Sequence, residues 1–134
     1  MKNKIEWEYS VPLVDANKID EIESKLIIKI PQQLKELIIN NNAGYPSLSK
    51  CNIPGFGEND VKMLLSYNET DDETIFQIID FFVKKFHKRV LPFASDSGSG
   101  YYCVKDDIIV FVSEETWIPI PIAEHISDFF SLLF

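Results

Sequence analysis

The sequence predicts an α+β fold, in which helices from the N-terminal, middle and C-terminal parts of the chain pack around an antiparallel or mixed sheet of about five to six strands. Three observations predict it. Two short helical patterns come first, short apolar runs with one inserted amphipathic pattern follow, and a helical pattern closes the chain. The chain has 134 residues, of which 46% are hydrophobic. This is enough for a single domain, 1–134, with a buried core.

The first third of the chain predicts an extended segment and two helices. Residues 5–11 alternate apolar and polar residues, as a strand does. Asp15 can cap a helix whose apolar residues recur every three or four positions. Those residues are Ile19, Ile22 and Leu26. Pro31 suits the first turn of a second helix, which we expect to stop at Gly44.

An amphipathic helix is inserted after residue 70. Thr70 and Glu73 have the spacing of a capping box, and Asp71 and Asp72 suit a positive helix N-terminus. The apolar stripe of this helix is Ile75, Ile79, Phe82 and Phe86. Basic residues crowd its C-terminal end, namely Lys84, Lys85, His87, Lys88 and Arg89. They either complement the helix dipole, which we favour, or form a binding patch.

Short apolar runs predict the strands, near 47–52 and over 61–67, 90–94, 100–105 and 108–113. Residues 45–60 are otherwise rich in turn formers. Asp106 and Asp107 form the expected hairpin turn between the last two runs. Pro119 and Pro121 indicate an edge strand or an exit from the sheet. The closing helix is expected to carry Ile122, Ile126, Phe129, Phe130 and Leu133 on one side.

The stretch FASDSGSGYY, residues 93–102, raises three alternatives. Asp96-Ser97-Gly98-Ser99 has the form found around aspartic-protease carboxylates. However, such sites need apolar residues directly before the Asp and a later glycine, and no glycine follows Gly100. A phosphate-binding loop needs a following helix and a Lys, which are also missing. We therefore predict a turn between two strands, in which Asp96 or Ser97 bonds to nearby N–H groups.

Cysteine, histidine and metal chemistry find little support. Cys51 and Cys103 are far apart, and we expect two buried thiols, with no metal site and no cofactor. A nucleophilic pair of Cys103 with His87 or His125 is the alternative. It is disfavoured because Cys103 lies in an apolar strand run. We expect both histidines at the surface and predict that the chain is not an enzyme.

The negative charge lies in the second part of the chain. The net charge is −8; residues 1–53 balance seven Lys with seven Asp/Glu, whereas residues 54–134 hold six Lys/Arg and fourteen Asp/Glu. Such a surface repels nucleic acid and attracts a basic protein, although it can also serve solubility alone. No membrane segment or signal peptide is visible. We expect a cytoplasmic protein, and a monomer in preference to an oligomer.

Three segments then carry a family pattern. The first has an apolar helix with a Glu, then Ile-Pro, then a second apolar helix ending in Asn-x-Gly: Ile19, Glu23, Leu26, Ile30-Pro31, Leu37 and Asn42-Ala43-Gly44. VKMLLSYNETDDETIFQII and RVLPFASDSGSGYYCV are the second and third, and DDIIVFVSEETW follows. From about Ile19 onward, this order resembles the SUKH superfamily, or SMI1/KNR4 family. Two departures are the missing glycine near Ile27-Ile28 and Asn-Ala-Gly in place of Asn-Gly-Gly.

The resemblance implies a bacterial immunity protein without catalysis or cofactor, which neutralises a cognate polymorphic or contact-dependent toxin by direct contact. Many such toxins are nucleases, which are basic, so an acidic inhibitor would be steered to them. Some eukaryotic relatives are regulatory scaffolds, which is the alternative function. An enzyme using Asp96 or Cys103 is a third. The candidate contact residues are Glu58, Asp60, Asp96, Asp106, Asp107, Glu114, Glu115 and Trp117. The alternative interpretation is that each acid belongs to the solvated surface and that Trp117 belongs to the core.

Overall fold

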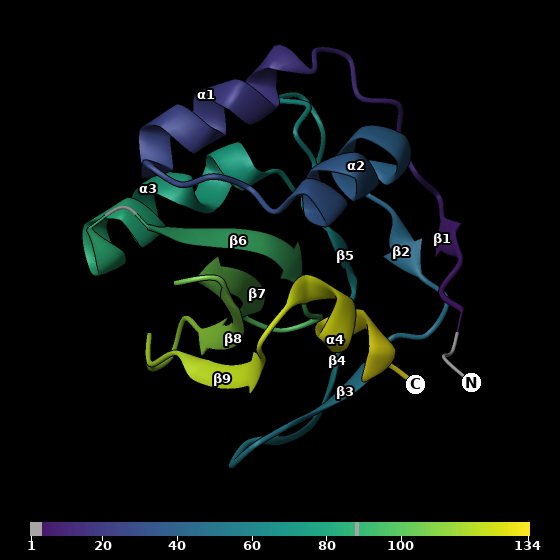
Figure 1. Ribbon diagram of the computed structural model, residues 1–134, viewed down its shortest axis with the longest axis vertical. Helices are drawn as coiled ribbons and strands as arrows, with labels where there is room; N and C mark the ends of the chain where they lie inside the picture. Colours follow the sequence, from purple (N-terminus) through teal and green to yellow (C-terminus); the bar gives the residue numbers. More distant parts are fainter. Residues whose placement is uncertain (1–3, 88) are drawn as a thin grey trace.

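A five-stranded antiparallel sheet forms the centre of the protein (Figure 1). The computed structural model describes residues 4–87 and 89–134, so Lys88 of the basic cluster lies outside it. Each neighbouring pair of strands is antiparallel. In sheet order the strands are β5 (Met63–Leu64), β6 (Val90–Ser95), β7 (Gly100–Lys105), β8 (Ile108–Ser113) and β9 (Ile120–Ala123). The predicted α+β class and antiparallel sheet are confirmed.

Four helices and two small strand pairs complete the fold. The helices are α1 (Asn17–Leu26), α2 (Gln32–Asn41), α3 (Ile75–Phe86) and α4 (Ile126–Ser131). The strand pairs are β1 (Trp7–Glu8) with β2 (Tyr45–Pro46), and β3 (Lys50–Ile53) with β4 (Gly57–Asp60). In Figure 1 the β3–β4 ribbon extends away from the helices α1 and α2. The chain end pairs with this ribbon, because Lys50 and Phe134 exchange two backbone hydrogen bonds of 3.0 Å.

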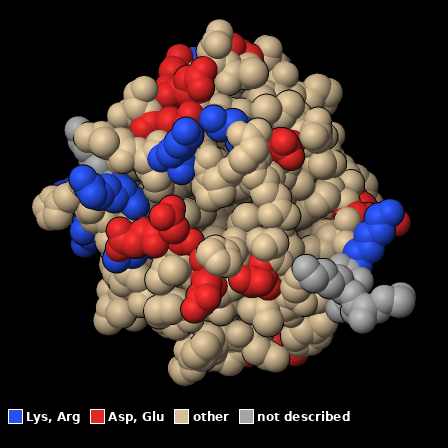
Figure 2. All heavy atoms as spheres, in the orientation of Figure 1, with Lys and Arg blue, Asp and Glu red and all other residues tan. Residues whose placement is uncertain are grey.

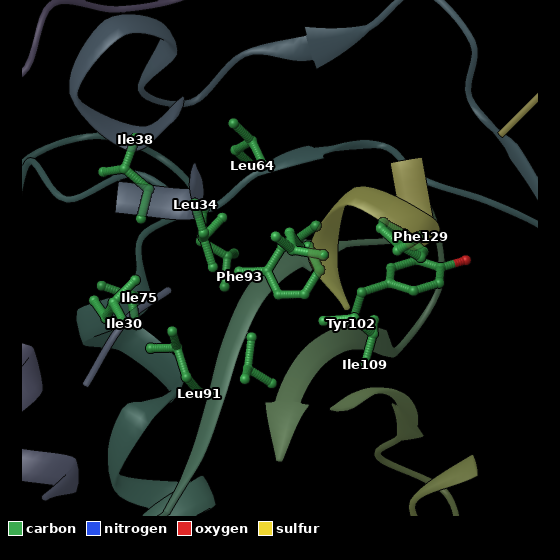
Figure 3. Packing of buried hydrophobic residues seen from close by; sticks show 14 of the residues in the cluster. Ile30, Leu34, Ile38, Leu64, Ile75, Leu91, Phe93, Tyr102, Ile109 and Phe129 are labelled. Atoms are coloured by element: carbon green, nitrogen blue, oxygen red, sulfur yellow. The ribbon is translucent and has the colours of Figure 1, made fainter. Parts of the chain in front are cut away.

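Both faces of the sheet are apolar and both are covered. Tyr102, Val104 and Phe111 belong to the larger core, with side chains of α1, α2 and α4; Figure 3 shows its centre. The alternate positions Cys103, Val110 and Val112 pack with Phe82 of α3 in a second cluster. This agrees with the prediction that helices pack around the sheet. The strands β7 and β8 carry apolar residues at successive positions, so both faces of the sheet must be buried. The end of α3 and Trp117 cover the face that carries Cys103, Val110 and Val112.

The inserted helix begins four residues later than predicted. Thr74 is the cap: its Oγ1 accepts from the N–H of Gln77, whose Oε1 accepts from the N–H of Thr74, both at 3.3 Å. The predicted box of Thr70 and Glu73 was wrong. Asp71 instead accepts hydrogen bonds from Ser66 and Asn68, which holds this segment as a turn before the helix.

Two other expectations were also wrong. Ile122 lies in β9 and not in the closing helix, which begins at Ile126. The strand β4 was missed, because residues 57–60 contain no apolar residue. The predicted edge position of Pro121 is confirmed, since β9 is the last strand of the sheet. Strands were also predicted over 5–11 and 61–67. Only a short part of each range forms a strand, namely β1 and β5.

The two predicted turns of the sheet are confirmed. Asp106 and Asp107 form a two-residue hairpin loop with φ of 50° and 65°, the geometry of a type I′ turn. Residues 96–99 join β6 to β7. Gly100 is needed there for space and not for a left-handed backbone, because a Cβ on it would meet Phe111 Cε1 at 2.5 Å and Asp96 Oδ2 closer still.

Candidate functional site

Six of the eight predicted contact residues lie at two opposite ends of the sheet. The turn 96–99 precedes β7 and the hairpin of Asp106 and Asp107 follows it. The N–H of Glu114 donates to the carbonyl of Ser99 at 2.9 Å, which places the loop after β8 beside the turn 96–99. The structure therefore brings Asp60, Asp96, Glu114 and Glu115 to one end of the sheet. Asp106 and Asp107 lie at the other end and do not join them.

Asp96 is part of the interior of the turn. It is only 7% exposed, and its Oδ1 accepts from the N–H groups of Gly98 and Gly100, both at 2.8 Å. Its Oδ2 accepts from Asn59 Nδ2 at 2.9 Å. These bonds confirm the predicted turn-forming role. A carboxylate with its acceptors occupied inside the chain is poorly placed to meet a partner.

Asp60 and Asn59 of β4 tie the ribbon to this turn. The carboxylate of Asp60 accepts from the N–H of Ser97 at 3.0 Å and from its hydroxyl group. The backbone carbonyl of Asp60 accepts from the Tyr102 hydroxyl at 2.9 Å. Asn59 lies between Asp96 and Tyr102 and donates to both. Asp60 is thus fixed in position but still half-exposed at the end of the sheet.

Carboxylates from separate segments meet around Tyr101. Burial, and then the neighbouring Glu114, raises the pKa of the Tyr101 hydroxyl, and Glu73 and Asp96 add to this effect. Glu73 also pairs with Lys62 at 2.9 Å, and this hydrogen bond raises the pKa of the ammonium group. We call Asp60, Glu73, Glu114 and Glu115 the acidic end of the sheet.

A hollow of about 640 Å³ opens next to the acidic end. Its walls come from the N-terminal segment, the turn after α2, β2, β5 with its flanking residues, and the segment before α3. Its lining residues are Tyr9, Val11, Ala43, Tyr45, Lys62, Met63, Ser66, Thr70, Asp71, Asp72 and Glu73. In the sequence, Asp71, Asp72 and Glu73 were expected at the N-terminus of the inserted helix. The hollow itself was not predicted. Tyr9 and Tyr45 lie beside these acids only because β1 pairs with β2, and the sequence gives no local signal for that pairing.

A buried polar network fixes the walls of the hollow. Asn42 Nδ2 donates to Ser66 Oγ at 3.0 Å, and Asn42 Oδ1 accepts from the N–H of Tyr67 at 2.9 Å. The Ser66 hydroxyl donates to Asp71 Oδ2 at 2.5 Å, and Asn68 Nδ2 donates to the same oxygen at 3.1 Å. Such a satisfied network holds the segment rigidly.

The remaining predicted residues have different environments. Glu58 is exposed on the β3–β4 ribbon, opposite Asn52. Trp117 is half-buried, and its ring lies 5.3 Å from that of Phe82 in an edge-to-face arrangement. Lys85 Nζ lies 5.6 Å from the centre of the Trp117 ring. Trp117 therefore serves mainly to cover the sheet, with one edge left at the surface.

The geometry offers no assembled catalytic set among the described residues. Both thiols are buried, and burial raises the pKa of Cys51 and of Cys103, which keeps them protonated and unreactive. His87 and His125 are exposed, as predicted. Residues 4–87 and 89–134 contain no group of three His, Cys, Asp or Glu side chains that could hold a metal ion. The part of the chain that the structure describes has no helix of sufficient length and hydrophobicity to span a membrane.

The acidic surface is distributed. Figure 2 shows acidic side chains in several separate places on one face, with Lys or Arg beside some of them. The ion pairs of Lys18 with Glu69, Lys25 with Asp80 and Lys35 with Glu23 illustrate this mixing. The net charge alone therefore does not locate a binding surface.

These features define an α+β domain whose distinctive surface is an acid-rich end of the sheet beside a rigid, aromatic-walled hollow. The comparison with protein families identifies it further. The chain belongs to the SMI1/KNR4 family (SUKH-1), whose model matches residues 13–132. The resemblance seen in the sequence is thereby confirmed. Members of this family are generally non-catalytic immunity proteins. A comparison with curated protein sequences finds no match.

Proposed function

We propose that the chain is an immunity protein, which binds a cognate toxin directly in the cytoplasm and neutralises it. Membership of the SMI1/KNR4 family (SUKH-1) is the observation that carries this proposal. The acidic end of the sheet supports it, because four carboxylates from three chain segments are held there by the fold. Direct protein contact, without catalysis or cofactor, is the mechanism that fits such a surface.

The partner is a basic protein, and nucleases are the class of toxin that this charge suits best. A nuclease carries positive charge to bind phosphates, and the chain carries a net charge of −8. Complementary charge speeds diffusional encounter and selects against acidic partners. Glu114 and Glu115 are exposed in the loop after β8, so a partner can reach both side chains. The same charge disfavours direct binding of nucleic acid by this chain.

Co-expression with the toxin domain encoded by the adjacent gene tests the proposal. We expect growth to be rescued and the two proteins to copurify. The double variant Glu114→Gln, Glu115→Gln should lower the association rate several-fold at low salt, because it removes two charges from the acidic end. The matched control is Asp106→Asn, Asp107→Asn, which removes two charges at the other end. Failure of rescue together with absence of a complex would refute toxin neutralisation and favour a regulatory scaffold.

A further inference from the structure

We propose that the hollow beside the acidic end receives an arginine side chain of the protein partner. This inference rests on the proposed function only in that the chain has a protein partner. The hollow holds the three carboxylates of Asp71, Asp72 and Glu73 and a single ammonium group, that of Lys62. Its charge is therefore negative even with Lys62 present, and a cationic group is the complement.

The carboxylates differ in their freedom to bind. Asp71 Oδ2 is occupied by Ser66 and Asn68, and Glu73 pairs with Lys62. Asp72 is exposed, and among the described residues it forms neither a hydrogen bond nor an ion pair. Asp72 is thus the principal acceptor for an incoming cation. The Oδ1 atom of Asp71, which accepts neither of these two hydrogen bonds, is a second acceptor.

Two tyrosine rings supply the flat surfaces that a guanidinium group prefers. Tyr9 is 80% exposed, and its ring lies edge-to-face against Tyr45 at 5.9 Å and 87°. Both line the hollow. An exposed aromatic ring next to carboxylates attracts a cation through its π face, and arginine stacks on such rings more often than lysine.

A buried hydroxyl group without a hydrogen-bond partner in the described part of the chain lies one strand away from the lining of the hollow. Ser95 is 5% exposed, and its Oγ has no hydrogen-bond partner among the described residues. Ser95 pairs with Met63 of β5 and with Tyr101 of β7, so the three side chains point to the same side of the sheet. Met63 lines the hollow. Ser95 is therefore the cross-strand neighbour of one residue of the lining, Met63, and its buried hydroxyl group lies behind that lining.

The geometry argues against a metal ion as the occupant. The carboxylates that line the hollow do not converge closely enough, with any other Cys, His, Asp or Glu of the described residues, to hold an ion. A guanidinium group has five N–H donors spread over a plane and can reach separated acceptors. A planar guanidinium group therefore suits this wide hollow better than a compact metal ion does.

The test uses the intact protein and the probe N-acetyl-arginine N′-methylamide in an NMR titration. We expect amide shifts confined to the lining of the hollow, around Tyr9, Tyr45 and Asp72. The uncharged citrulline analogue should cause none, and the lysine analogue should bind at least about threefold more weakly. Equal shifts from citrulline, equal binding of lysine, or shifts centred on Glu114 would overturn the assignment.

Variants separate this inference from the proposed function. Asp72→Asn and Tyr9→Ala should each weaken binding of the arginine probe about five- to tenfold, whereas Asp107→Asn at the far end of the sheet should not. Both hollow variants should also weaken the toxin complex. If they bind the toxin like the wild-type protein, the arginine site is refuted and toxin binding stands. If the wild-type protein binds no toxin, the proposed function fails whatever the probe shows.

Discussion

Replacement of Gly100 by alanine tests the close packing at the acidic end of the sheet. A Cβ at this position would lie 2.5 Å from Phe111 Cε1 and closer still to Asp96 Oδ2. Neither neighbour can move freely, because Phe111 is buried in the core and Asp96 accepts three hydrogen bonds. The new methyl group must therefore displace a packed ring, a bonded carboxylate, or both.

The magnitude follows from these two displacements. Overpacking of a core costs about 1–3 kcal/mol, and a weakened hydrogen bond to a buried carboxylate adds about 1–2 kcal/mol. We expect Gly100→Ala to lower the free energy of unfolding by roughly 2–5 kcal/mol. Urea denaturation measures this as a lower midpoint, by about 1 M or more at an unchanged slope.

Gly98→Ala is the matched control in the same turn. Its Cβ would meet only Asp96 Oδ1, at 3.6 Å, which is an ordinary contact. Gly98 is exposed, so we expect a change within about 0.5 kcal/mol. Equal stability of Gly100→Ala and the wild-type protein would refute the packing argument, and equal losses for both variants would show that backbone freedom decides the turn.

Two further predictions concern stability. Thr74→Ala should lower the free energy of unfolding, measured by urea denaturation, by about 1 kcal/mol because it removes the observed helix cap, whereas Thr70→Ala should leave it almost unchanged. A larger loss for Thr70→Ala than for Thr74→Ala would show that Thr70 is the cap. Burial raises the pKa of Tyr67 and of Tyr102 in the folded state. Above pH 10 the unfolded chain therefore holds fewer protons, and stability should fall by up to about 1.4 kcal/mol per pH unit for each tyrosine. An unfolding free energy that stays constant from pH 9 to 11.5 would contradict this.

The sequence predicted elements whose signals are local. The stripe of Ile75, Ile79 and Phe82 identifies α3, since the spacing alone determines which side is apolar. The hairpin at Asp106 and Asp107 was expected without a glycine, because two apolar runs flank two aspartates that tolerate a left-handed backbone.

Elements that depend on distant contacts were not predictable. Two capping patterns, at Thr70 and at Thr74, lie four residues apart, and only the bonds of Asp71 to Ser66 and Asn68 decide between them. The strand β4 has no apolar residue and is held by Asn59 through Asp96 and Tyr102.

The candidate site was partly predictable for the same reason. Glu114 and Glu115 were identified from charge and a turn position, and the structure leaves both exposed at the acidic end. Asp96 looked equally suitable in the sequence, yet its burial follows from the tight turn at Gly100. The hollow depends on Tyr9 reaching segments far along the chain, and no local pattern indicates that.

Binding of the purified chain to the toxin domain encoded beside it, followed by surface plasmon resonance across a salt series, tests the central claim most directly. The account predicts a one-to-one complex whose association rate falls at least about tenfold between low and high salt, with a smaller fall for Glu114→Gln, Glu115→Gln. Absence of binding, or an association rate independent of salt and of these two charges, would contradict it.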